Sequence, residues 1–176
     1  VVDIDTATFD IANVSYAEPQ VANQFTVINS GVFASVSDTN SENITHLEIT
    51  PPTGALPAGL ASWADVQFKL GSTIVSFDGS KWSFDFTTTT PSLSGLSVKT
   101  PQYFDGQLNF NSEITVVDKS GSLQDSATKT DAFAVTIIPV SSTISTTVPT
   151  NAVIHENISH TDVGSLLSGF AVGLID

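Results

Sequence analysis

Apolar residues recur at every second position through much of this chain, and that spacing constrains the fold more than any other feature. The pattern is clear from Val66 to Leu70 and again from Trp82 to Phe86. A period of two places successive side chains on opposite faces of a strand. No window of ten residues carries a convincing stripe at the 3.6-residue period of a helix. We therefore predict an all-β chain.

Turn-forming residues divide these strands at intervals typical of a β-sandwich. Asp78-Gly79 lies between two alternating runs and predicts a tight hairpin, because both central residues of such a turn need positive φ. Ser62 followed by Asp65 resembles a helix start, and predicts at most one short helical turn. Trp82 alternates with two phenylalanines, which predicts a position in the core.

The length of 176 residues suits one domain, with room for a fragment of a neighbour. We expect an N-terminal extension or strand over 1–24, the sandwich domain over 25–140 and a Ser/Thr-rich linker over 141–150. Residues 151–176 are too apolar for a solvated linker. They are expected to form extra strands that pack on the sandwich, on an adjoining module or on another copy of the chain.

The charge is strongly acidic, with 18 Asp and Glu against 5 Lys and a formal net charge of −13. This field repels nucleic acid and acidic membrane surfaces, and it attracts divalent cations. The absence of cysteine excludes a disulfide scaffold. The most apolar run, 163–175, is too short to span a bilayer. We therefore expect neither nucleic-acid binding nor membrane insertion.

Seven short segments follow one another in a characteristic order: 37–42, 47–50, 56–59, 77–82, 93–96, 101–106 and 135–140. Together they resemble the cadherin-like, Ig-like antiparallel β-sandwich repeats of giant bacterial RTX adhesins. The resemblance implies a secreted, calcium-stiffened module at the bacterial cell surface, with adjacent adhesin domains as partners. As a ligand-binding module it would bind a peptide or glycan of a host or neighbouring cell. The alternatives are an extender repeat without its own ligand and a carbohydrate-active accessory domain.

Calcium takes six to eight oxygen ligands, which loops rich in acidic and amide side chains supply. Three stretches carry such side chains: Asp38, Asn40 and Glu42; Asp118, Ser120, Ser122 and Asp125; Asp3 and Asp5. In an Ig-like strand order, the first two stretches are the B–C and F–G loops, which share one pole of the sandwich. The Asp78 turn is expected at that same pole. The same residue types are also ordinary turn formers that bind nothing.

Aromatic residues outside the predicted core are candidates for ligand contact. Trp63 lies in a connection flanked by Pro and Gly and is the first choice, and Tyr16 or Tyr103 could also stack on a sugar. The three histidines lack the spacing of a zinc site, and no Gly-x-Ser-x-Gly elbow occurs. We therefore do not expect an enzyme.

Overall fold

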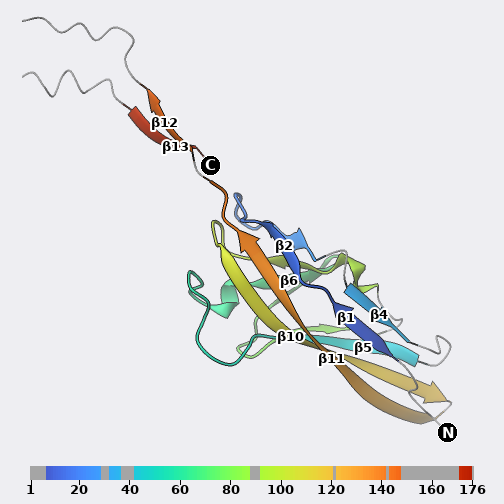
Figure 1. Cartoon of the computed structure of the whole chain (residues 1–176). Coiled ribbons are helices and arrows are strands. Elements are labelled where there is room, and N and C mark those ends of the chain that lie inside the picture. Colours follow the sequence, from blue (N-terminus) through green and yellow to red (C-terminus); the bar gives the residue numbers. More distant parts are fainter. Residues whose placement is uncertain are drawn as a thin grey trace, which may run out of the picture. The chain divides into compact units, whose positions relative to one another are not determined.

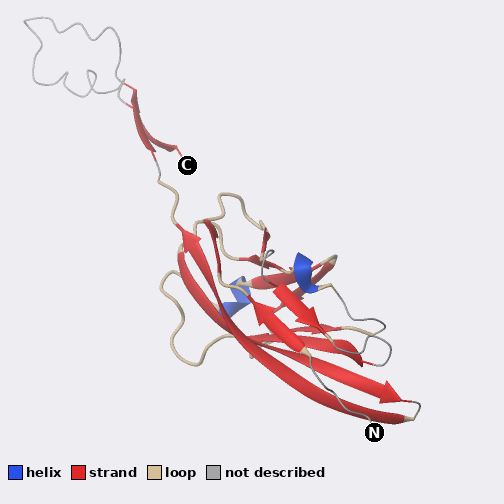
Figure 2. Cartoon of the chain, turned by 45° about the vertical axis from the view of Figure 1, so that its right-hand side comes forward, coloured by secondary structure: helices blue, strands red, loops and turns tan. Residues whose placement is uncertain are grey.

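The computed structural model describes residues 7–28, 32–36, 42–87, 92–120, 122–141, 143–147 and 171–175. The chain divides into two compact units, Val1–Pro139 and Val140–Asp176. In the described residues every regular element is a strand, apart from two short 3₁₀ turns (Figure 2). None of them forms a helix long and apolar enough to cross a membrane. The prediction of an all-β chain with mostly antiparallel sheets is confirmed.

A five-stranded sheet forms one layer of the first unit (Figure 1). Its strands, in spatial order, are β2 (Val14–Ala17), β11 (Leu123–Ile138), β10 (Gly106–Ser120), β5 (Glu42–Thr50) and β8 (Trp82–Asp85). All neighbours are antiparallel except β2, which runs parallel to β11. The early strand β2 therefore lies beside the last strand of the unit.

A four-stranded sheet forms the other main layer. Its order is β3 (Thr26–Val27), β9 (Ser97–Lys99), β6 (Gln67–Leu70) and β7 (Thr73–Ser76), and a separate pair joins β1 (Thr8–Ile11) to β4 (Val32–Ser35). The two 3₁₀ turns are η1 (Trp63–Asp65) and η2 (Leu93–Gly95). The short turn predicted after Ser62 is confirmed, since the Ser62 hydroxyl accepts from the Ala64 N–H at 3.1 Å. Together the sheets give a sandwich-like architecture.

The second unit contains one antiparallel pair, β12 (Thr143–Thr147) and β13 (Ala171–Ile175). β12 falls within the stretch expected as a linker, and β13 falls within the apolar tail. The tail thus pairs with the segment immediately after the first unit. Residues 148–170 and 176 lie outside the described part of the chain.

An aromatic cluster between the two sheets forms the centre of the core. Trp82 is fully buried, and its ring makes edge contacts with Phe68 of β6 and Phe110 of β10 at centroid distances of 5.2 and 5.7 Å. Its indole N–H donates to the carbonyl of Val66 at 2.9 Å, so its one polar group is satisfied. The predicted core position of Trp82 is confirmed.

The predicted Asp78-Gly79 hairpin is wrong in its pairing, although the turn exists. The Asp78 N–H donates to the carbonyl of Lys81 at 3.0 Å, and Gly79 has a φ of +107°. Asp78 is not among the residues with positive φ. The flanking strands β7 and β8 pair in different sheets, with β6 and β5 respectively. The turn crosses between the layers because Trp82 must face the core from the five-stranded sheet.

β10 and β11 form one long hairpin that was predicted as two shorter strands with a loop between them. The pairing runs without a break from Gly106 opposite Ile137 to Ser120 opposite Leu123 (Figure 1). Only two residues connect the strands. The expected F–G loop is therefore mostly strand, because the cross-strand pairing continues as far as Ser120 and Leu123.

Replacement of Trp82 tests the contribution of the aromatic cluster to stability. Trp82→Ala should lower the free energy of unfolding by about 3–5 kcal/mol, because it removes a large buried ring and leaves the Val66 carbonyl without its donor. Urea titration measures the change. Val21→Ala is the control, since Val21 is 66% exposed and should change stability by less than about 0.5 kcal/mol. A loss at Trp82 no larger than that of the control would contradict the assignment.

Burial raises the pKa of Tyr16 on β2 to about 12. An unfolded tyrosine titrates near pH 10. The contribution of the neutral Tyr16 side chain to the free energy of unfolding is therefore fully present below pH 10 and is lost as the pH rises through 12. We expect the free energy of unfolding to fall across this window, and Tyr16→Phe to remove most of the fall. Denaturant titrations from pH 9 to 12 measure it. An equal fall in both proteins would show that other groups are responsible.

Candidate functional site

Three carboxylates predicted as calcium ligands lie in one row across adjacent strands. On the five-stranded sheet Glu42 of β5 is directly opposite Asp118 of β10, and Asp118 is directly opposite Asp125 of β11. Residues that face each other across neighbouring strands have their side chains on the same face of the sheet. The register therefore brings together acids that lie more than eighty residues apart in the chain.

Two members of this row are buried, Glu42 at one end and Asp118 in the middle. Glu42 is 1% exposed and Asp118 is 6% exposed, because both follow the core-facing alternation of Ile44 and Val116. Within the described part of the chain, Asp118 Oδ1 has no hydrogen-bond partner. A buried carboxylate oxygen without a donor or cation carries a large desolvation cost. A cation or a hydrogen-bond donor beside this oxygen would offset that cost.

The third member of the row, at its β11 end, is solvated. Asp125 is exposed, and its Oδ1 accepts from the Ser126 N–H at 2.8 Å. Among the described residues, no three His, Cys, Asp or Glu side chains are grouped closely enough to hold a metal ion. A calcium ion at this row would therefore need further oxygens besides these carboxylates, as its coordination number of six to eight requires.

The other predicted ligands lie either at the tip of the β10–β11 hairpin or outside the described residues. Ser120 is in β10, and Ser122 is exposed in the two-residue turn after it. Asp3, Asp5, Asp38 and Asn40 lie outside the described residues. These six assignments stay predictions.

Asp78 lies at the opposite end of the sheet from the row, contrary to the expectation that it shares that pole. β8 starts with Trp82 opposite Ile49, near the end of β5, whereas Glu42 starts β5. Asp78 Oδ1 accepts from the Lys81 N–H and the Ser80 N–H, both at 2.8 Å. These bonds lower the pKa of Asp78 and give it a turn-forming role.

Trp63, the predicted ligand contact, is only partly exposed. It begins η1, and its ring packs against Trp82 and Phe110 at centroid distances of 6.0 and 5.8 Å. Part of this side chain therefore belongs to the aromatic core. A ligand contact through its remaining surface stays a prediction.

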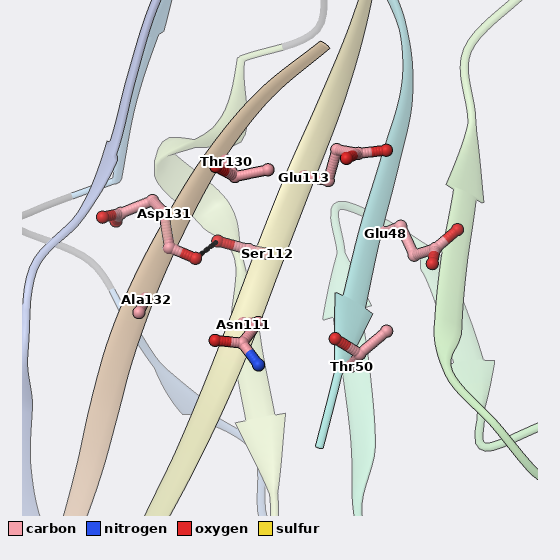
Figure 3. Close-up of a pocket in the computed structure, with 8 residues that line it drawn as sticks. All are labelled: Glu48, Thr50, Asn111, Ser112, Glu113, Thr130, Asp131 and Ala132. Atoms are coloured by element: carbon pink, nitrogen blue, oxygen red, sulfur yellow. Dashed lines mark hydrogen bonds between the residues drawn. The ribbon is translucent and has the colours of Figure 1, made fainter. Parts of the chain in front are cut away.

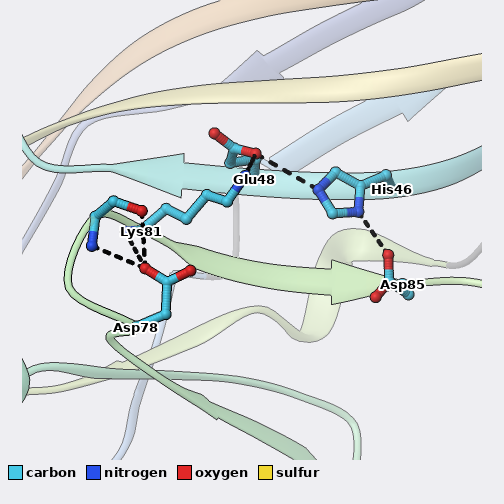
Figure 4. Close-up of polar contacts among 6 residues, drawn as sticks. His46, Glu48, Asp78, Lys81 and Asp85 are labelled. Carbon is cyan, nitrogen blue, oxygen red and sulfur yellow. Dashed lines mark hydrogen bonds and ion pairs between the residues drawn. The ribbon is translucent and has the colours of Figure 1, made fainter.

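A second polar cluster lies beside β5 and β8 (Figure 4). Lys81 Nζ donates to Glu48 Oε2 at 2.6 Å, and His46 Nδ1 lies 2.7 Å from Asp85 Oδ1. His46 Nε2 is also 3.6 Å from Glu48 Oε2. The hydrogen bond to Glu48 raises the pKa of Lys81, so the ammonium is the stable form. The cluster connects two strands through their side chains.

A groove of about 470 Å³ adjoins Glu48. It is lined by Glu48, Thr50, Asn111, Ser112, Glu113, Thr130, Asp131 and Ala132, drawn in Figure 3. Glu113 lies directly opposite Glu48, so two like charges face each other there. Lys81 compensates this repulsion. The polar lining suits the hydroxyls of a ligand or a cation, although the carboxylate of Glu48 is already paired with Lys81.

Sequence reasoning missed the Glu48–Glu113 pair. Glu48 alternates with Leu47 and Ile49, which would have predicted that it faces away from the core. The sequence pattern does not state which residue of another strand lies opposite, since register depends on the assembled sheet.

Comparison with protein-family models, with curated proteins and with solved structures finds no match for this chain.

The Glu48–Glu113 pair can be tested through its cation. Lys81→Gln should lower the melting temperature at low salt, because it leaves the two carboxylates facing each other. The deficit should shrink in 1 M salt, where the screening length is about 3 Å. Thermal melts at both ionic strengths measure it, with Lys81→Arg as the charge-preserving control. A deficit that is independent of salt would contradict the electrostatic role.

Proposed function

We propose that this chain is an extracellular, calcium-dependent ligand-binding module of a bacterial surface adhesin, which binds a peptide or glycan. The observation that carries the calcium assignment is the buried Asp118 carboxylate, which lies between Glu42 and Asp125 and has an oxygen without a described partner. Calcium would offset most of the negative charge of the row and stabilise this end of the sheet. The ion thus supports the fold on which ligand binding depends.

Strand order supports an Ig-like or cadherin-like sandwich as the finer description. The neighbours β11, β10 and β5 follow the G-F-C order of one Ig sheet. On the other side β1 pairs with β4, and β3 pairs with β9, which pairs with β6. If β3 and β4 are two parts of strand B, this is the A-B-E-D order. The same order accounts for the row, since strands C, F and G contribute its three acids.

Charge and organisation support the setting. The net charge of −13 favours cations over nucleic acid or acidic membranes as partners. The second unit, which begins at Val140, is consistent with a tandem array in which adjacent adhesin domains are neighbours. Such a tandem arrangement of domains also favours the alternative of a calcium-stiffened extender without its own ligand.

A binding assay on immobilised oligosaccharides and peptides separates the ligand-binding module from the extender. Specific binding supports the module, and no binding supports the extender.

Calcium should raise the melting temperature. A ligand that binds only the folded state at a hundredfold excess over its Kd contributes about 2.7 kcal/mol. Thermal melts in EDTA, in millimolar calcium and in millimolar magnesium measure the effect. Equal midpoints in EDTA and calcium would overturn the metal assignment.

Asp118→Asn sharpens this test because it separates burial cost from calcium binding. In EDTA the variant should be at least as stable as the parent, since an amide is cheaper to bury than an unpaired carboxylate. In calcium it should lose most of the increment. Asp65→Asn, an exposed change in η1, should keep the full increment. An unchanged increment in Asp118→Asn would place the calcium elsewhere.

A further inference from the structure

Three residues with left-handed backbone conformations line one cavity in the first unit. They are Gly59, Tyr103 and Gly106, with φ values of +84°, +60° and +132°. The cavity has a volume of about 560 Å³, a size that accommodates a small ligand. It is lined by Pro57, Ala58, Gly59, Tyr103, Phe104, Asp105, Gly106 and Gln107. Two separate connections therefore build one recess, at the end of the sheet where β10 begins.

Tyr103 is the unusual member of this group. Glycine adopts positive φ freely, whereas a bulky aromatic residue does so at a conformational cost. Strained residues of this kind persist only where the surroundings hold them, and they concentrate at ligand sites. Here the Tyr103 N–H donates to the Pro19 carbonyl at 3.0 Å, and Gln102 Nε2 donates to the Gln20 carbonyl at 2.6 Å. The turn is therefore clamped to the segment after β2.

The strain does not serve the core. Tyr103 is 51% exposed, whereas the next residue, Phe104, is 4% exposed and fills the space beneath. A Cβ on Gly59 or Gly106 would lie 3.7 Å from the Phe104 ring. The two glycines thus leave bare backbone around a buried ring, with the exposed Tyr103 beside it. Phe104 packs, and Tyr103 is presented to solvent.

The chemistry of the lining identifies the class of ligand. One exposed aromatic ring offers a face for the apolar C–H side of a pyranose, while Asp105 accepts hydrogen bonds from hydroxyls and Gln107 can donate and accept them. No lining residue is cationic, and the chain has a net charge of −13, so sialylated, sulfated and phosphorylated ligands are disfavoured. Much of the wall is turn backbone, which is a poor template for adding a peptide strand. These features favour a neutral sugar.

We propose that Tyr103, Asp105 and Gln107 form a binding site for a neutral sugar residue of a glycan. This inference rests on the proposed ligand-binding function and names its ligand class. The site is separate from the acidic row, since Gly106 begins β10 and Asp118 lies near its end, roughly 40 Å along the strand. Sugar contact therefore does not pass through calcium.

The experiment uses the full chain on an array of neutral and sialylated oligosaccharides, followed by calorimetric titration of the best neutral hit. Tyr103→Phe keeps the ring and should retain affinity within about threefold, whereas Tyr103→Asn should lose about tenfold or more. Asn tolerates positive φ, so this variant should melt at or above the parent temperature. Loss of affinity without loss of stability is the signature of a binding residue held under strain. Ile74→Ala on β7, with an equal exposed fraction of 51%, is the matched control and should bind normally.

Each outcome decides a separate point. Neutral-sugar binding that is unchanged in Tyr103→Asn overturns this site and leaves the proposed ligand-binding function standing. A preference for sialylated sugars, or no binding of any sugar, overturns the ligand class. Binding on a parallel peptide array would then support the other branch of the proposed function. Binding lost in EDTA below the melting temperature of the calcium-free protein would show contact through calcium and overturn the separation of the sites. Binding retained in EDTA and lost in Tyr103→Asn supports the proposal.

Discussion

The indole N–H of Trp82 donates to the carbonyl of Val66, which immediately precedes β6 in the opposite sheet. This bond joins the two layers, and the rings of Phe68 and Phe110 pack against the same indole. Trp82 reaches Val66 from β8, which pairs with β5 and not with β7, its neighbour in sequence. That choice also brings Lys81 to Glu48, so the surface cluster follows from the buried one.

The long β10–β11 hairpin distributes the candidate chemistry of the unit. At its closed end Asp118 and Asp125 face each other, and β5 adds Glu42 to the row. At its open end Gly106 leaves a bare backbone beside the exposed ring of Tyr103. The hairpin thus places the proposed calcium site and the proposed sugar site at its two opposite ends. The separation makes the two independently testable by substitution.

Local patterns in the sequence predict what is local in the structure. Alternation predicts strands at 66–70 and 82–86, and β6 and β8 are found there. Partner choice is not local, which is why the Asp78-Gly79 turn was expected to close a hairpin and instead crosses between sheets. The sequence predicts the acids of the row as calcium ligands in loops. Which of them lie opposite one another depends on the register between strands, which no single segment determines. The sequence predicts Tyr103 as a candidate for ligand contact. Its strained backbone conformation depends on the hydrogen bond to the Pro19 carbonyl, which the sequence does not predict.

The parallel pairing of β2 with β11 also governs how this unit responds to mechanical force. Val14 to Ala17 lie beside Val135 to Ile138, with the Glu18 N–H bonded to the Ile138 carbonyl. Tension applied before β2 and after β11 pulls these parallel strands in opposite directions along their length. The hydrogen bonds between them are then sheared together, whereas an antiparallel end pair pulled from one side would open one bond at a time. A module built this way resists extension at its two ends before its core is loaded.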